Sequence, residues 1–238
     1  LFFSTPTPPT PLLRSLVGSE MCIRDRGNVM NPVVAFDIGK VLLDFDYGIL
    51  IAKLAPRTQW DKGVLDAYLN QSPLLAEYES GRLTSSEFFT RIQSETKFNG
   101  TESEFAGLFK NIFTPIEAVI NMHRQLVESG VPTYTFSNTN EMAVRHISRS
   151  YDFWPRFTGH ILSHEVKSLK PDAGIYESLE AASGREGESI IYLDDRPENI
   201  EAGRARGWRA CCHQDASKTR NFLEVQGVLT SSDHGSTA

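Results

Sequence analysis

Short apolar runs of strand length recur along the chain and alternate with longer segments of helical periodicity. The helical segments read TPIEAVINMHRQLVESG, PDAGIYESLEAASG and PENIEAGRARG, each with a proline near its start and a glycine at its end. Strands that alternate with helices are typical of a parallel sheet covered on both faces. The expected strands are VVAF (33–36), VPTYTF (131–136), HIL (160–162), SIIYL (189–193) and WRACC (208–212).

The first of these helical segments carries local start and stop signals. Thr114 is expected as its N-cap, Pro115 as its first helical residue and Glu117 as the partner that completes a capping box. Gly130 is expected to end the helix.

The stretch between the first strand and this helix has no strand-like run of comparable clarity. It carries a second capping box, Thr84 to Glu87, ahead of an apolar helical face. We therefore expect an α/β fold, with a Rossmann-like parallel sheet core and a helical cap inserted after the first strand. The core would comprise residues 30–47 and 119–230, and the cap residues 48–118.

The two ends of the chain are expected to lie outside this fold. Residues 1–29 have scattered prolines and no continuous apolar region, and the segment SLVGSEMCIRDR resembles a translated sequencing adaptor. We expect residues 1–29 to be non-native or disordered, with Met30 as the true start. Residues 231–238, SSDHGSTA, are expected to be a disordered tail.

Composition narrows the class of protein. The chain has 238 residues, of which 40% are hydrophobic and 23% charged, with a net charge of −6. This balance argues against nucleic-acid binding through bulk electrostatics. No apolar run approaches the ~18 residues of a membrane span. The three cysteines form neither a disulfide framework nor a zinc motif, which favours a cytoplasmic location.

Polar side chains gather where the expected strands end. In an open α/β sheet, ligands bind beyond the carboxyl ends of the strands. Any one of these positions alone is more typical of a turn or a helix start. Their arrival in this order at successive strand ends predicts a site. The residues are Asp37, Ser137, Asn138, Lys170, Asp194 and Asp195.

The ordered set resembles the haloacid dehalogenase (HAD) superfamily, whose members are mostly phosphatases. FDIGKVLLDFD is similar to its first motif, FSNTN to the second, LKPD to the third and LDDRPENI to the fourth. The resemblance extends from Met30 to about Val228. The glycine two residues after Asp37 and the stretch EYESGRLTSSEFF are most similar to a subgroup of glucose-1-phosphatase-like enzymes.

This resemblance implies a nucleophile and a metal site. Asp37 would attack phosphorus to form an aspartyl-phosphate that water then hydrolyses. Mg²⁺ prefers oxygen ligands and bridges carboxylates and phosphate. Asp37, the backbone carbonyl of Gly39 and Asp195 would hold Mg²⁺. Asp194 would support this metal site through water or through Lys170.

The resemblance also assigns three residues to catalysis and phosphate binding. A phosphate dianion repels a carboxylate nucleophile, so the site must be cationic. Lys170 would add a positive charge beside Asp37. Ser137 would donate to phosphoryl oxygens as charge develops, and Asn138 would border the substrate.

Gly39 departs from the pattern of the superfamily, where most phosphatases carry an aspartate that protonates the leaving oxygen. Such a group is worth ~10²–10⁴-fold in rate. Asp44 and Asp46 are expected beyond the strand, on the way to the cap, and are no obvious substitutes. Lys40 is expected to be exposed at the entrance of the site.

The leading interpretation is a Mg²⁺-dependent phosphatase for a small phosphorylated metabolite, plausibly a sugar 1-phosphate, acting as a monomer or homodimer. One alternative is a haloacid dehalogenase-type hydrolase, again with Asp37 as nucleophile. This is disfavoured, because that family usually has an aromatic residue at the position of Gly39 and does not need the acidic pair. Another alternative is a non-catalytic phosphometabolite-binding protein, which the loss of the acid at Gly39 favours and the retention of Asp37, Lys170 and Asp195 opposes. Neither a nucleic-acid nor a membrane partner is expected.

Overall fold

A computed structural model describes residues 31–70, 72–109 and 112–230 of the chain, and the described residues from Asn31 on belong to one compact unit. The expectations for residues 1–29, for Met30 as the start and for residues 231–238 lie outside the described residues. Within the described ranges, no helix combines the length and the apolar character that crossing a membrane requires.

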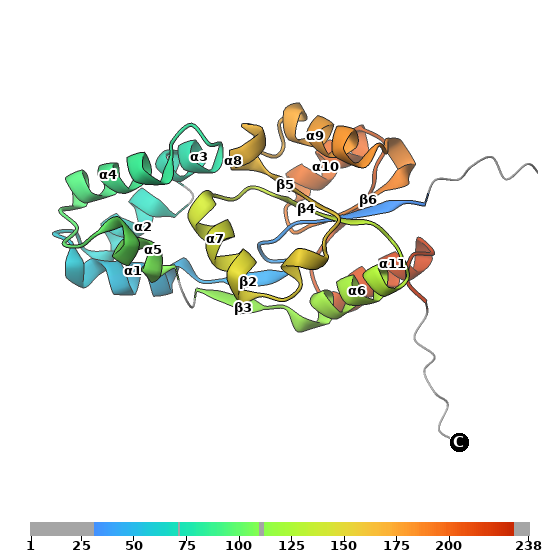
Figure 1. Cartoon of the computed structure of the whole chain (residues 1–238), viewed down its shortest axis with the longest axis horizontal. Helices are drawn as coiled ribbons and strands as arrows, with labels where there is room; N and C mark the ends of the chain where they lie inside the picture. Colours follow the sequence, from blue (N-terminus) through green and yellow to red (C-terminus); the bar gives the residue numbers. More distant parts are fainter. Residues whose placement is uncertain (1–30, 71, 110–111, 231–238) are drawn as a thin grey trace, which may run out of the picture. The chain divides into compact units, whose positions relative to one another are not determined.

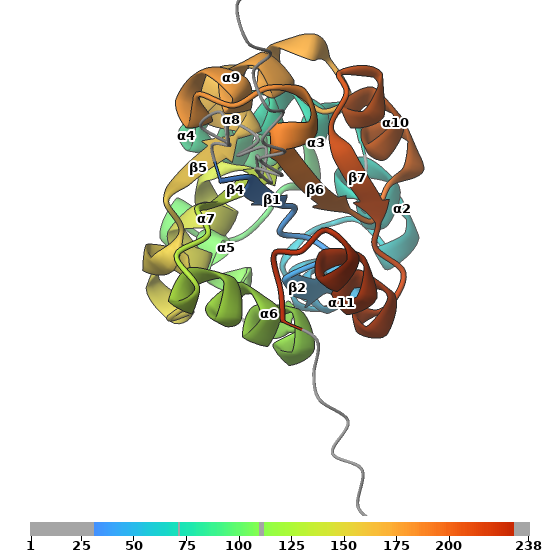
Figure 2. The same cartoon turned by 90° about the vertical axis from the view of Figure 1, so that its right-hand side faces the viewer.

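Five parallel strands form the central sheet (Figure 1), in the order β5-β4-β1-β6-β7 (Figure 2). The middle strand, β1, pairs with β4 and β6, with Val34 opposite Thr133 on one side and Ile191 on the other. All five expected strands are confirmed, with small shifts of their ends. Their bounds are β1 Val33–Phe36, β4 Thr133–Ser137, β5 Gly159–Leu162, β6 Ile190–Asp194 and β7 Arg209–Cys212.

Helices cover both faces of this sheet, as the sequence predicts. They are α6 Glu117–Glu128, α7 Glu141–Ser150, α8 Ser163–Val166, α9 Ala173–Ser183, α10 Pro197–Ala205 and α11 Ala216–Val225, with short turns η2 Trp154–Arg156 and η3 Gly187–Ser189. Alternate residues of a strand point to opposite faces. Val34 and Phe36 pack with α6, α7 and α11, and Val33 and Ala35 pack with α9 and α10. Figure 2 shows α6 and α11 on the opposite side of the sheet from α9 and α10.

The chain between β1 and α6 forms five helices with a buried apolar cluster of their own. Their bounds are α1 Tyr47–Leu54, α2 Lys62–Leu69, α3 Pro73–Glu79, α4 Ser85–Thr96 and α5 Glu102–Leu108, with the turn η1 Ala55–Arg57. In this cluster Tyr78 stacks on Phe88, with ring centroids 4.3 Å apart. We therefore propose to keep the division into a core, residues 30–47 and 119–230, and a cap, residues 48–118.

A short antiparallel ribbon at the base of these helices corrects one prediction. Strand β2, Leu43–Phe45, pairs with β3, Phe113–Pro115, and the Ile116 amide donates to the Leu42 carbonyl at 2.9 Å. The expectation of Thr114 as N-cap and Pro115 as first helical residue is therefore wrong. Helix α6 begins at Glu117 after Ile116, which provides no side-chain cap. Thr114 and Pro115 belong to β3 because they pair with a strand distant in sequence, although the local pattern favoured a helix.

Other start and stop signals act as predicted. The capping box between Thr84 and Glu87 is present at the start of α4. Pro197 is the first residue of α10. Gly130 after α6 and Gly184 after α9 adopt positive φ angles of 74° and 63°, which glycine reaches without a steric cost.

His123 of α6 makes the core sensitive to acid. Its side chain is fully buried, its ring stacks on Phe157 at 3.9 Å, and its Nε2 lies 3.0 Å from the Thr133 hydroxyl. Its Nδ1 has no hydrogen-bond partner among the described residues. Burial, with Arg156 and Arg124 adding repulsion, lowers the pKa of His123 from 6.5 to about 4. The ring is therefore neutral in the folded protein at pH values where it is protonated in the unfolded chain.

We expect His123 to destabilise the fold as the pH falls from about 6.5 towards about 4. In this window the unfolded chain binds the proton and the folded protein does not, so the free energy of unfolding falls with pH, by up to about 3 kcal/mol for this one group. His123→Phe keeps an aromatic ring and removes the titration. Urea unfolding of both proteins at neutral and acidic pH should show that the variant loses less stability. Equal losses would mean that other groups carry the acid response.

Candidate active site

The predicted polar residues meet at the carboxyl ends of three strands in the middle of the sheet. Asp37 follows β1 directly and its amide donates to the Leu193 carbonyl of β6 at 2.9 Å. Ser137 ends β4 and Asp194 ends β6. Because the strands are parallel, their carboxyl ends lie at the same edge of the sheet, and side chains far apart in sequence come together there.

Lys170, from the loop between α8 and α9, is the cation of this cluster. Its Nζ lies 3.0 Å from Asp37 Oδ1 and 2.5 Å from Asp194 Oδ2, and it donates to the Phe136 carbonyl at 2.9 Å. Burial alone would lower the pKa of Lys170, but Asp37 and Asp194 raise it overall. The ammonium is therefore charged, and its three N–H groups are all engaged by the protein.

Asp194 is the fixed centre of the hydrogen-bond network. Its side chain is fully buried and accepts from four other residues. The donors are Lys170 Nζ (2.5 Å), Tyr192 Oη (2.5 Å), the Arg196 amide (2.8 Å) and Asn199 Nδ2 (3.1 Å). Burial opposes ionisation of Asp194, but Lys170 and these hydrogen bonds lower its pKa overall. Both carboxylate oxygens are thus occupied by protein donors.

Three carboxylates of the cluster could hold a metal ion. One oxygen each from Asp37, Asp194 and Asp195 lies within 4.8 Å of the others. Asp195 is half-buried, and burial together with the neighbouring Asp194 raises its pKa. Burial also raises the pKa of Asp37, with Lys170 opposing and Asp194 adding to the shift. Clustered carboxylates that repel one another in a partly dry site are typical of an oxygen-ligand cation site.

Ser137 and Asn138 take different places around this centre. The Ser137 hydroxyl hydrogen-bonds Asp37, which favours the ionised form and counters the rise in the pKa of Asp37. The Asn138 side-chain amide instead forms two hydrogen bonds with the backbone of Lys170. Its Oδ1 accepts from the Lys170 amide at 2.7 Å, and its Nδ2 donates to the Lys170 carbonyl at 3.0 Å. These two hydrogen bonds hold the backbone of Lys170 in position. The expected contact of Asn138 with substrate stays a prediction.

The sequence and the fold of the chain were each compared with those of known proteins. No protein-family model matches the chain. A sesquiterpene phosphatase from Aspergillus oryzae is 24% identical over 134 residues, which span 55% of this chain and 67% of the relative. Solved structures resemble the chain over more of its length.

A HAD-family enzyme from Bacteroides thetaiotaomicron, in complex with magnesium and inorganic phosphate, superposes with a TM-score of 0.68. It shares 18% sequence identity, over 79% of this chain and 98% of that enzyme. A HAD-like hydrolase from Porphyromonas gingivalis gives 0.66 at 19% identity, over 81% and 98% of the two chains. The chain has the HAD fold. An L-2-haloacid dehalogenase from Xanthobacter autotrophicus also shares it, with a TM-score of 0.56 at 13% identity over 84% and 87%.

The HAD fold confirms the architecture that the motifs predicted, an α/β core with a parallel sheet. The assignment to a glucose-1-phosphatase-like subgroup stays a prediction. The roles assigned to Asp37, Ser137, Lys170 and the acidic pair likewise stay predictions, although the structure brings these residues together.

Gly39 lies against the ring of Phe45, a contact that the sequence does not reveal. It is not among the residues with positive φ, so its backbone does not require glycine. A Cβ built on it would lie 2.8 Å from Cε1 of Phe45. The Phe45 ring, held edge-on against Tyr47 with centroids 5.6 Å apart, fills the space that a side chain at this position of the HAD fold would need.

The acidic residues after Gly39 are engaged elsewhere, as expected. Asp44 lies on β2, is exposed and forms an ion pair with Lys40. Asp46 caps α1 and accepts from the Gly48 amide at 2.7 Å. Lys40 is exposed, as predicted, and its Nζ lies 4.7 Å from the centroid of the Phe45 ring. Neither carboxylate substitutes for the side chain that Gly39 lacks.

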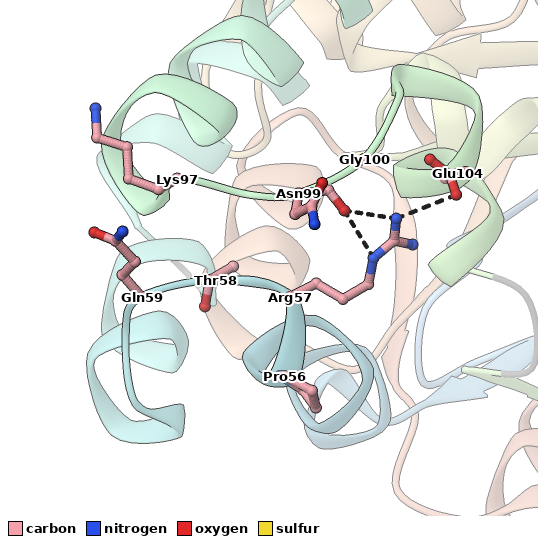
Figure 3. Close-up of a pocket in the computed structure, with 8 residues that line it drawn as sticks. All are labelled: Pro56, Arg57, Thr58, Gln59, Lys97, Asn99, Gly100 and Glu104. Atoms are coloured by element: carbon pink, nitrogen blue, oxygen red, sulfur yellow. Dashed lines mark hydrogen bonds and ion pairs between the residues drawn. The ribbon is translucent and has the colours of Figure 1, made fainter.

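A separate hollow of about 480 Å³ lies between η1 and the segment that joins α4 to α5 (Figure 3). Two of its lining residues, Arg57 and Glu104, form an ion pair at 3.2 Å, and Arg57 also donates to the Asn99 carbonyl. None of the residues at the strand ends contributes to it. The hollow is lined by Pro56, Arg57, Thr58, Gln59, Lys97, Asn99, Gly100 and Glu104. With its arginine paired internally, it offers no chemistry comparable to that at the strand ends.

Proposed function

We propose that the chain is a Mg²⁺-dependent phosphatase that hydrolyses a small phosphorylated metabolite through an aspartyl-phosphate on Asp37. The observation that carries this proposal is the contact between Asp37 and Lys170, 3.0 Å apart at the end of the central strand. A carboxylate held at a rigid strand end beside a buried cation can approach a phosphate dianion that would otherwise repel it.

Each residue of the cluster has a distinct role in the proposed reaction. Asp37 supplies the attacking oxygen, and Lys170 offsets the charge of the phosphoryl group. Ser137, beside Asp37, donates to a phosphoryl oxygen. Asp194 holds Lys170 in place, since its oxygens are taken up by protein donors.

The donor set at the strand ends suits a magnesium ion, because Mg²⁺ prefers carboxylate and carbonyl oxygens. We propose Asp37, Asp195 and the Gly39 carbonyl as its protein ligands, with Asp194 supporting them. When bound, Mg²⁺ would neutralise charge on the phosphoryl group. The Bacteroides enzyme with this fold is in complex with magnesium and inorganic phosphate, which supports the proposal.

The chemistry of the site also bears on the leaving group of the substrate. We propose a sugar 1-phosphate, because an anomeric oxygen leaves more readily than an ordinary alcohol and the site lacks a carboxyl at Gly39. The sesquiterpene phosphatase similar to this chain supports phosphate-ester chemistry without fixing the alcohol.

The test is release of phosphate from a panel of phosphorylated metabolites that includes sugar 1-phosphates and alkyl phosphates, with and without Mg²⁺. We expect phosphate release that stops when EDTA removes the metal. Halide release from 2-haloacids, assayed in parallel, would instead favour the dehalogenase chemistry of the Xanthobacter protein. Binding of phosphometabolites without turnover would favour a binding protein.

A further inference from the structure

Phosphate-ester hydrolysis needs a proton on the departing oxygen, and Gly39 cannot supply it. The three N–H groups of Lys170 are engaged by Asp37, Asp194 and the Phe136 carbonyl. The nearby carboxylates Asp44 and Asp46 are occupied outside the site. None of these three side chains is free to give a proton to the departing oxygen.

The end of helix α3 is held against the strand ends by contacts far apart in sequence. The Ser163 hydroxyl donates to the backbone carbonyl of Glu79 at 2.6 Å. Lys167 donates to the Gly81 carbonyl at 2.8 Å, and the Tyr78 hydroxyl accepts from the Met142 amide at 3.1 Å. Figure 1 shows α3 beside α8, the short helix that follows β5. These contacts fix the position of Glu79, the last residue of α3.

The carboxyl group of Glu79 shares the electrostatic environment of the nucleophile. Burial raises the pKa of Glu79 to about 7, and the negative charge of Asp37 adds to this rise. Arg196 and Lys170 act in the opposite direction. Glu79 in turn contributes to the raised pKa of the buried hydroxyl of Tyr47, from α1. The Ser163 hydroxyl that holds the Glu79 carbonyl also donates to the Thr139 carbonyl at 3.1 Å. Glu79 is therefore anchored beside the segment that follows Ser137.

Glu79 is thus a carboxylic acid carried by the cap and anchored next to the strand ends. A group of this kind can give a proton in one step and take one in the next. The other acidic residue of the same helix lacks this environment. Glu77 is exposed and pairs with Arg91 at 2.8 Å.

We propose that Glu79 is the general acid and base of the reaction, supplied by the cap in place of the side chain that Gly39 lacks. The proposal rests on the phosphatase function proposed above. In the first step, the Asp37 oxygen bonds to phosphorus as the bond from phosphorus to the ester oxygen breaks. The departing oxygen keeps the electron pair and takes the proton of Glu79.

The second step returns the site to its starting state. Water attacks the phosphorus of the aspartyl-phosphate and gives one proton to the Glu79 carboxylate. The bond from phosphorus to the Asp37 oxygen breaks, and its electron pair returns to Asp37. Phosphate leaves, Asp37 is again a carboxylate and Glu79 is again protonated.

The test uses Glu79→Gln, which keeps size and polarity but cannot donate or accept this proton. Substrates are para-nitrophenyl phosphate, whose phenolate leaves unaided, and glycerol 1-phosphate, whose alkoxide does not. We expect kcat/KM to fall by about 10²–10⁴-fold for the alkyl ester and to change little for the aryl ester. Since the second step also loses its base, the aryl ester should show a burst of one equivalent of nitrophenolate and a lower kcat.

Two further variants separate this role from a structural one. Glu77→Gln makes the same change on the same helix and should leave both esters unaffected. Glu79→Asp keeps a carboxyl on a shorter stem and should retain part of the alkyl-ester activity. Equal losses with both esters in Glu79→Gln, or no loss, would overturn the role of Glu79 while an active wild type upheld the phosphatase. A wild type that releases no phosphate from these esters or from the metabolite panel would overturn both proposals.

Discussion

Asp37→Asn should abolish phosphate release, with a fall in kcat of at least roughly 10³-fold, because an amide cannot form the acyl-phosphate. The substitution is isosteric and Lys170 keeps its contact with Asp194, so the fold should survive. Phosphate release by the variant is the first measurement. Mass spectrometry of acid-quenched protein should find one phosphoryl group on the wild type and none on the variant.

Asp44→Asn provides a matched control for this experiment. Asp44 is a carboxylate close to Asp37 in sequence, but it is exposed on β2 and pairs with Lys40. Its substitution should leave turnover close to that of the wild type. Near-normal turnover by pure Asp37→Asn protein would refute the covalent mechanism, whatever the control shows.

Asp194→Ala should unfold far more readily than the wild type. The substitution removes one of the two carboxylates that compensate the buried charge of Lys170 and takes away the acceptor of Tyr192 and Asn199. Removal of one partner from a buried ion pair typically costs about 3–5 kcal/mol. We therefore expect a loss of this size in the free energy of unfolding, measured by chemical denaturation.

Asp195→Ala is the neighbouring comparison. Asp195 lies beside Asp194 but is half-buried and has no comparable set of donors. Its substitution should leave the free energy of unfolding nearly unchanged and raise the concentration of Mg²⁺ needed for activity. Similar unfolding of the two variants would show that Asp194 does not organise the site.

The core and the cluster of catalytic candidates could be predicted from the sequence because both depend on local patterns. The apolar run Val33–Phe36 predicts a buried strand, and Asp37, the proposed nucleophile, directly follows it. Asp194 could have been linked to Tyr192 in the same way, since residues two apart on a strand share a face. The sequence carries no signal, however, for the contact of Asn199 with Asp194.

The features that sequence reasoning missed depend on contacts between distant segments. The β2–β3 ribbon consists of two strands of three residues each, too short for periodicity to reveal. The close approach of Gly39 to the Phe45 ring depends on where that ring lies, which no local pattern specifies. Glu79 stands in a stretch with other acidic residues, and only the docking of α3 sets it apart from Glu77.

The β2–β3 ribbon makes the cap an interchangeable module. The chain leaves the core and returns to it through two paired strands, and the Asp46 amide donates to the Ile112 carbonyl at 3.0 Å where they diverge. Entry and exit are thus neighbours, so helices between them can be lengthened, shortened or replaced without altering the register of β1 that presents Asp37. The residues proposed for hydrolysis can therefore stay constant while the helices of the cap vary, provided that each variant still brings a carboxyl to the place proposed for Glu79.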